Sequence, residues 1–260
     1  SRALVHNLSI VKQLRLGIGD TLTIYKANMI IPQVLENKTE SGSLEIPNVC
    51  PVCGAKTERE KDTADIKCTS PNCPAQLERH MINFVGRDAM DIKGFGATYI
   101  MELVRLGYLK DIADIYDLKQ HREELIEQGI IGKEKNTDKL LDAIEKSKQN
   151  EAFQLLTGFG IPNVGKAAAK TILKHFGSIE ALMQADMESL QQVADVGEVT
   201  ALCIRNYFQD ENNCKIIERL KEAGVNMEMA ESGSEDGRFD GLTFVITGTL
   251  PTMDRKAAAA

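Results

Sequence analysis

Four of the six cysteines lie close together, in two pairs separated by a charged loop, and this feature constrains the chain most. In "CPVCGAKTEREKDTADIKCTSPNC" the thiols follow the pattern C-x2-C-x14-C-x4-C, at Cys50, Cys53, Cys68 and Cys73. This spacing is typical of two metal-binding knuckles brought together by a short loop or hairpin. Thiolates suit tetrahedral zinc, and four protein ligands leave no open position for a substrate. We therefore predict a structural Zn²⁺ site.

The alternative for these thiols is a pair of disulfides, which a reducing compartment disfavours. The segment is small and polar and has little apolar core of its own. If it binds zinc, we expect the metal to supply its folding free energy, on the order of 10 kcal/mol.

The chain has 260 residues and could bury one large core or, more naturally, two to four small ones. Its charged fraction of 27% and hydrophobic fraction of 43% are ordinary for a globular protein. No apolar run approaches the roughly 20 residues of a membrane span, and the N-terminus lacks the basic-then-apolar layout of a signal peptide. We expect that the chain has no membrane partner. We also expect it to be a cytoplasmic piece of a longer protein, and this piece to begin within a domain.

The net charge of −7 is distributed unevenly. Residues 1–38 carry five basic and two acidic side chains, a net charge of +3, whereas residues 181–240 carry five basic and thirteen acidic ones, a net charge of −8. A local surface that binds phosphate is therefore compatible with the acidic total.

A repeated pattern begins after the cysteines. The segment "PAQLERHMINFVG" has apolar residues at helical spacing, so we expect a helix to begin at 74–76. Four later segments each place a hydrophobic residue and a glycine before an amphipathic helix; the glycines are Gly96, Gly132, Gly165 and Gly197. The regular spacing predicts four stacked units, each made of a helix, a short glycine turn and a second helix.

Such turns can bind anions. A glycine lets the backbone approach a ligand, and the free N–H groups of a first helical turn attract negative charge. Phosphates of nucleic acid fit this site, and binding through backbone donors would be independent of sequence. The first turn, "KGFG", adds Lys93 and Gly94 to Gly96. The alternative is that these glycines serve packing alone.

The four units differ in charge. In the third, Lys166, Lys170 and Lys174 recur on one helix face, and residues 161–177 contain no acidic side chain, which favours phosphate. In the fourth, Asp195 and Glu198 flank the glycine and would repel phosphate. The second has an extra residue after Gly132. We expect the third unit to bind best and the fourth to be structural.

The two ends predict different structures. "LRLGIGDTLTIYKANMIIPQVLEN" alternates apolar residues beside a Gly-Asp turn and predicts β structure from a small barrel. "MEMAESGSEDGRFDG" contains a polar, acidic linker. "LTFVITGTL" predicts a buried strand and "MDRKAAAA" the start of a helix, so we expect an incomplete domain here.

In this order the parts closely resemble the C-terminal half of a bacterial NAD-dependent DNA ligase. "SRALVHN" with "LRLGIGDTLTIYKANMIIPQV" resembles the end of its OB-fold, and "AMDIKGFG" through "VADVGEV" its helix-hairpin-helix domain. "CPVCG" to "CTSPNCPAQ" is similar to its zinc finger, and "FDGLTFVITGTLPTMDRK" to the opening of its BRCT domain.

The resemblance implies a multidomain, mainly α chain with a partial OB-type β-barrel, a small zinc finger, a tandem helix-hairpin-helix domain and a truncated α/β BRCT domain. The implied bounds are 1–44 for the OB part, 45–76 for the finger, 77–229 for the hairpins, 230–237 for a linker and 238–260 for the BRCT part. Asn28-Met29 departs from the family, which usually has Gly and an acidic residue there.

The resemblance implies sealing of nicks in duplex DNA during replication and repair. The family uses Mg²⁺ and transfers AMP from NAD to a lysine and then to the 5′ phosphate at the nick. The resemblance implies that NAD and Mg²⁺ both bind outside this chain. The lysine needs a Lys-x-Asp-Gly setting, but the two Asp-Gly pairs here follow Ser234 and Arg238, so we expect the chain alone to be inactive. It would clamp nicked double-stranded DNA, independently of sequence and as a monomer, in the bacterial nucleoid. Arg2 and His6 would contact the backbone near the nick, or else serve as polar residues at a strand end.

A competing interpretation is a non-catalytic zinc and helix-hairpin-helix scaffold that binds DNA. A Lys-x-Asp-Gly sequence upstream of Ser1 would favour the ligase, and its absence would favour the scaffold.

Overall fold

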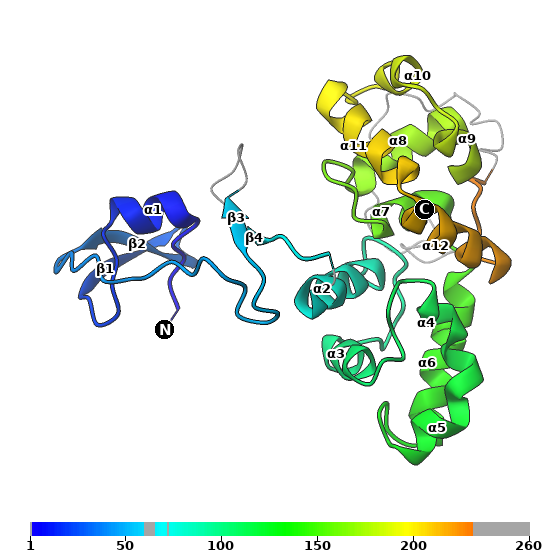
Figure 1. Ribbon diagram of the computed structural model, residues 1–260, viewed down its shortest axis with the longest axis horizontal. Coiled ribbons are helices and arrows are strands. Elements are labelled where there is room, and N and C mark those ends of the chain that lie inside the picture. The colour runs from blue at the N-terminus through cyan, green and yellow to red at the C-terminus, as the bar shows by residue number, and fades with distance from the viewer. Residues whose placement is uncertain (1, 60–65, 72, 231–260) are drawn as a thin grey trace, which may run out of the picture.

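The computed structural model describes residues 2–59, 66–71 and 73–230 (Figure 1). The expected BRCT segment, 238–260, and nearly all of the expected linker lie outside these residues. None of the described helices combines the length and apolar character that crossing a bilayer requires.

The N-terminal part is a short helix beside a β-hairpin. Helix α1 spans Leu8–Gln13 and is capped by the side chain of Asn7, whose oxygen accepts two backbone N–H bonds. Strands β1 (Leu22–Ala27) and β2 (Ile31–Asn37) pair antiparallel, with a bulge between Thr23 and Ile24. The β structure expected here is therefore confirmed, whereas the OB-type barrel remains a prediction.

The strand connection explains the unusual Asn28-Met29 pair. Both residues adopt left-handed backbone conformations, with φ of 49° and 63°. Asparagine tolerates this conformation well, but methionine does so at a cost that glycine would avoid. The turn forms here without the glycine that is typical at such positions.

A second hairpin carries the cysteine segment. Strands β3 (Thr57–Arg59) and β4 (Ile66–Cys68) pair antiparallel, so the charged loop does join the two thiol pairs through a hairpin. The side chain of Arg59 donates a hydrogen bond to Ser9 Oγ, 3.3 Å away, which connects this hairpin to α1. Figure 1 shows the hairpin between the N-terminal strands and the helical body.

The remainder of the described chain is helical. Four helix pairs follow one another: α2 (Pro74–Phe84) with α3 (Ala97–Arg105), α5 (Arg122–Glu127) with α6 (Glu134–Ser147), α7 (Ala152–Gly158) with α8 (Lys166–Phe176), and α10 (Met187–Gln191) with α11 (Glu198–Gln209). The short helices α4 (Asp114–Asp117) and α9 (Ile179–Met183), a 3₁₀ turn at Leu118–His121 and the last described helix, α12 (Glu211–Glu222), complete the body. The four predicted helix-turn-helix units are confirmed.

One continuous apolar core joins these helices. Its largest fully buried side chains come from different units and include Phe84, Ile100 and Leu155. The core packs the units into one body, so the position of each turn is set by its neighbours as well as by its own helices. The predicted domain boundary at 76/77 falls in the first turn of α2, which begins at Pro74.

Candidate metal centre and nucleic-acid interface

The four predicted ligands come together. The sulfur atoms of Cys50, Cys53, Cys68 and Cys73 all lie within 4.8 Å of one another. Two of the separations are 3.8 Å, between Cys50 and Cys73, and 3.4 Å, between Cys53 and Cys68. Tetrahedral zinc with Zn–S bonds of about 2.3 Å needs sulfur atoms about 3.8 Å apart. The donor set therefore fits a structural zinc ion.

Backbone geometry holds the first pair. The N–H of Gly54 donates to the carbonyl of Cys50 at 2.9 Å, and the N–H of Cys50 donates to Ala55 at 2.7 Å. Gly54 has φ of +72°, a conformation that a side chain would strain. The backbone N–H groups of Cys53 and Val52 lower the pKa of Cys50 to about 6, which favours the metal-binding thiolate.

The second pair shows why a cation is needed. The N–H of Ser70 acts to lower the pKa of Cys68, but burial and the neighbouring thiols outweigh it and raise the pKa to about 12. Four adjacent thiols cannot all ionise without a compensating charge. A divalent zinc ion would supply that charge and release the protons.

Cys73 connects the metal centre to the helical body. It is 1% exposed and is the N-cap residue of α2, which begins at the next residue, Pro74. The side chain of Gln76, in the first turn of α2, also donates to the carbonyl of Cys68 at 2.7 Å. The zinc site therefore fixes the start of the first hairpin.

Three of the four hairpin turns have the same backbone. In each, the fourth residue donates a hydrogen bond to the first and the third residue is left-handed, as a type II turn requires. The bonds are Phe95 to Ile92 (3.2 Å), Val164 to Ile161 (3.0 Å) and Val196 to Val193 (3.1 Å). The left-handed residues are Gly94 (φ 87°), Asn163 (φ 65°) and Asp195 (φ 64°).

The same three turns share a burial pattern. Their first and fourth residues are buried apolar side chains, which anchor the turn in the core, and the two residues between them are exposed. The next residue is an extended, exposed glycine that caps the following helix: Gly96 for α3, Gly165 for α8 and Gly197 for α11. No described side chain caps these three helices, so their first N–H groups suit an external anion.

The second turn differs from the expectation. Helix α6 is capped by Lys133, not by Gly132, which lies one residue earlier with φ of 111°. The first turn of α6 carries Glu134, whose carboxylate pairs with Arg122 at 2.9 Å. Arg122 also binds Asp138 at 2.6 Å and lowers the pKa of that carboxyl. Glu134 thus lies at the start of α6 and Asp138 one turn further on, so a phosphate there would meet negative charge.

The predicted basic side chains are all exposed: Lys93 lies in the first hairpin turn, and Lys166, Lys170 and Lys174 lie on α8, which follows the third. Lys93 lies 4.0 Å from Asp91, and Lys166 lies 3.7 Å from Asp88. Lys170 lies above the ring of Phe153, with its Nζ 5.8 Å from the ring centre. The sequence pattern does not reveal the pairing of Lys166 with Asp88, because the two residues lie far apart along the chain.

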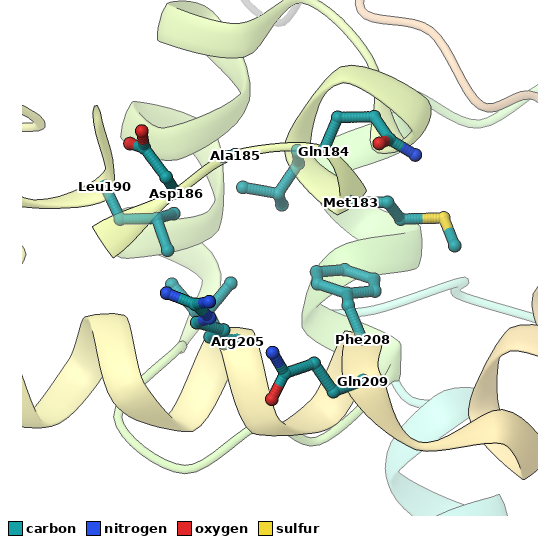
Figure 2. A pocket seen from close by; sticks show the side chains of 10 residues that line it. Met183, Gln184, Ala185, Asp186, Leu190, Arg205, Phe208 and Gln209 are labelled. Atoms are coloured by element: carbon teal, nitrogen blue, oxygen red, sulfur yellow. The ribbon is translucent and has the colours of Figure 1, made fainter. Parts of the chain in front are cut away.

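The fourth turn is acidic, as expected. The left-handed residue is Asp195, and Glu198 occupies the first turn of α11. A hollow of about 230 Å³ lies nearby, lined by residues of α9, α10 and α11 (Figure 2). Its carboxylate, Asp186, is already used to cap α10, since it accepts bonds from the N–H and Oγ of Ser189. These features suit packing better than phosphate binding.

Arg2 and His6 lie on the strand side of the molecule and are exposed. His6 has φ of 57°, and between them Leu4 bridges to Gln33 of β2.

Comparison with known proteins agrees with this geometry. Residues 49–75 match the NAD-dependent DNA ligase C4 zinc finger domain, and residues 154–217, which include the third and fourth turns, match the helix-hairpin-helix motif. A DNA ligase of Clostridium kluyveri is 45% identical over 265 residues, covering 100% of this chain and 40% of that protein. DNA ligases of Acetivibrio thermocellus and Desulforamulus reducens are 41% and 42% identical, each over 99% of this chain and 40% and 39% of their own lengths. The chain is therefore a homologue of the DNA ligases over about 40% of their length, and it carries the zinc finger of the NAD-dependent class.

Proposed function

We propose that the chain is the DNA-binding portion of an NAD-dependent DNA ligase and that it clamps nicked duplex DNA while another part of the enzyme performs the chemistry. The observation that carries this proposal is the set of repeated hairpin turns with exposed glycine caps, joined through Cys73 to a four-thiol zinc centre. Backbone amides and lysines bind phosphates without reading bases, so the clamp accepts any sequence.

The contacts divide unequally among the turns. Gly94, Gly96 and Lys93 of the first turn and Gly165 with Lys166, Lys170 and Lys174 of the third form the main phosphate contacts. Gly132 and Gly197 belong to turns whose acidic neighbours oppose phosphate, so these turns serve mainly to pack the helical body. Arg2 and His6 contact the backbone near the nick.

Zinc is the structural ion of the finger, whereas NAD and Mg²⁺ bind outside this chain. The hairpin of β1 and β2 belongs to an OB-type barrel, which is supported by its exposed apolar residues Ile24 (49%), Ile31 (48%) and Leu35 (59%). Residues 238–260 open a BRCT domain. The enzyme acts as a monomer in the bacterial cytoplasm, at the nucleoid, where thiols stay reduced for zinc.

The test uses the full protein to which this chain belongs. Incubation with NAD should give a covalent AMP adduct that mass spectrometry detects, and added nicked duplex should then be joined. The 260-residue chain alone is the control: it should bind nicked duplex but form no adduct, because it lacks a Lys-x-Asp-Gly sequence. A full-length protein that binds DNA but keeps its unmodified mass with NAD would contradict the ligase proposal and favour a non-catalytic scaffold.

A further inference from the structure

Helix α7 holds the loop that precedes the first hairpin turn. This loop, residues 86–91, joins the end of α2 to the turn. Gln154 of α7 donates a side-chain hydrogen bond to the carbonyl of Ala89 at 3.0 Å, and Asn150, just before α7, donates to Met90 at 2.7 Å. Because these bonds satisfy backbone carbonyls, they fix the path of the loop and not only the position of a side chain.

The body of α2 is held against the end of α7 in the same way. His80 Nε2 lies 3.2 Å from the carbonyl of Gly158, and Asn83 Nδ2 donates to Thr157 at 3.4 Å. Burial lowers the pKa of His80, so its ring is neutral near pH 7 and can donate its Nε2 proton to that carbonyl.

Gly158 allows the two helices to approach this closely. A Cβ atom built on Gly158 would lie 2.8 Å from the ring of Phe84, which is fully buried in α2. Real Cβ atoms essentially never show such a separation, so a side chain at this position must displace either the buried ring of Phe84 or the packing of α7 against α2. We call the contacts among α2, loop 86–91 and α7 the α2–α7 joint.

The joint lies between the two basic turns. Asp91 of the loop is next to Lys93 of the first turn (4.0 Å), and Asp88 of the same loop is next to Lys166 of the third (3.7 Å). The stretch of chain from Asp88 to Asp91 spans at most about 11 Å. When the lengths of the two aspartate side chains and the two ion-pair distances are added, the ammonium groups of Lys93 and Lys166 lie within about 30 Å of each other. This distance is shorter than one helical turn of duplex DNA, about 34 Å.

We propose that the α2–α7 joint is a positioning element that holds the first and third hairpin turns at a fixed spacing, so that both bind phosphates of one duplex at the same time. The inference rests on the proposed DNA binding and deepens it. Two linked binding elements bind far more tightly than either alone when their spacing is correct, and this gain disappears when the geometry forbids simultaneous engagement. Gly158, Gln154 and Asn150 are then positioning residues that need not touch DNA.

The test is the salt dependence of binding to a nicked duplex, measured with the 260-residue chain. Gly158→Ala should weaken binding about tenfold or more and make the slope of log K against log salt shallower, by about 0.9 for each phosphate that the protein no longer neutralises. The double variant Gly158→Ala with Phe84→Leu, in which the colliding ring is removed, should recover both affinity and slope. Thermal melting and zinc content show whether each variant is folded.

Three results separate the possible failures. A wild-type chain that does not bind nicked duplex contradicts the proposed function itself. A folded Gly158→Ala variant with wild-type affinity and slope overturns the positioning inference and leaves DNA binding intact. If Gly158→Ala does not fold, Gln154→Ala, which removes only the bond to the loop, should shift affinity and slope in the same direction by a smaller amount, and an unchanged slope in that variant overturns the inference.

Discussion

At the residue scale, the zinc centre depends on individual thiols, because each sulfur fills one of four positions around the metal. Cys50→Ser should therefore abolish stoichiometric zinc binding, and Cys68→Ser should do the same. A serine hydroxyl is a poor zinc ligand at neutral pH. Zinc content by plasma mass spectrometry measures the effect, and faster proteolysis within residues 45–73 should accompany it, since metal binding supplies the folding free energy of this segment.

Cys203→Ser is the matched control for that change. Cys203 is half-buried on α11 and does not belong to the thiol cluster. Its substitution should leave the zinc content unchanged. Retention of zinc by Cys50→Ser, to the level of this control, would reject the four-thiol site.

At the element scale, the lysine face of α8 should decide much of the affinity for DNA. Lys166→Glu with Lys170→Glu reverses two charges next to the third turn. We expect weaker binding to all duplex sequences alike and a shallower salt slope, because each phosphate left without its lysine lowers the slope by about 0.9. Fluorescence anisotropy at several salt concentrations, with duplexes of different sequence, measures both quantities.

The chain offers a control with the same spacing and the same charge change. Lys135 and Lys139 are exposed on α6, which follows the second hairpin turn and begins with Glu134. Lys135→Glu with Lys139→Glu should reduce affinity and slope much less. Equal effects of the two pairs would mean that the α8 lysines act only through net charge, as an ordinary solvated face.

At the scale of the whole molecule, Arg219 ties α12 to the middle of the body. From α12 it binds Asp111 (2.7 Å), Asp114 (2.7 Å) and Asp117 (2.9 Å) around α4. Removing the cation leaves three carboxylates facing one another, so Arg219→Ala should destabilise the helical body by about 2 kcal/mol. The melting temperature should then fall by about 4–8 °C.

Lys221→Ala, on the same helix, is the control for that measurement. Lys221 pairs with Glu180 at 3.1 Å, but its side chain is 64% exposed, and exposed pairs contribute about 0–1 kcal/mol. Its melting temperature should stay close to that of the wild type. If the melting temperature of Arg219→Ala is no lower than that of Lys221→Ala, the ion pairs between Arg219 and the three aspartates do not stabilise the helical body.

Much of this architecture could be predicted from the sequence, because its signals are local. Thiols at metal-ligand spacing, glycines before amphipathic helices and the apolar residues that flank each turn all act within a few residues of chain. The zinc ligands, the hairpin units and the acidic character of the fourth turn follow from such patterns. The glycine pattern places the cap of α6 one residue too early, since Lys133 and not Gly132 precedes the first helical residue.

Local sequence patterns predict the character of each segment: a pair of zinc knuckles, β structure near the N-terminus and a series of helix-turn-helix units. The spacing of these units does not follow from such patterns, because it depends on contacts between residues 60 or more positions apart. Examples are the hydrogen bonds of Gln154 with Ala89 and of His80 with Gly158, and the ion pair of Arg219 with Asp111. No periodicity or motif in the sequence indicates these contacts. Local propensity acts along the chain, whereas close packing acts through space, and the spacing of the basic turns depends on the latter.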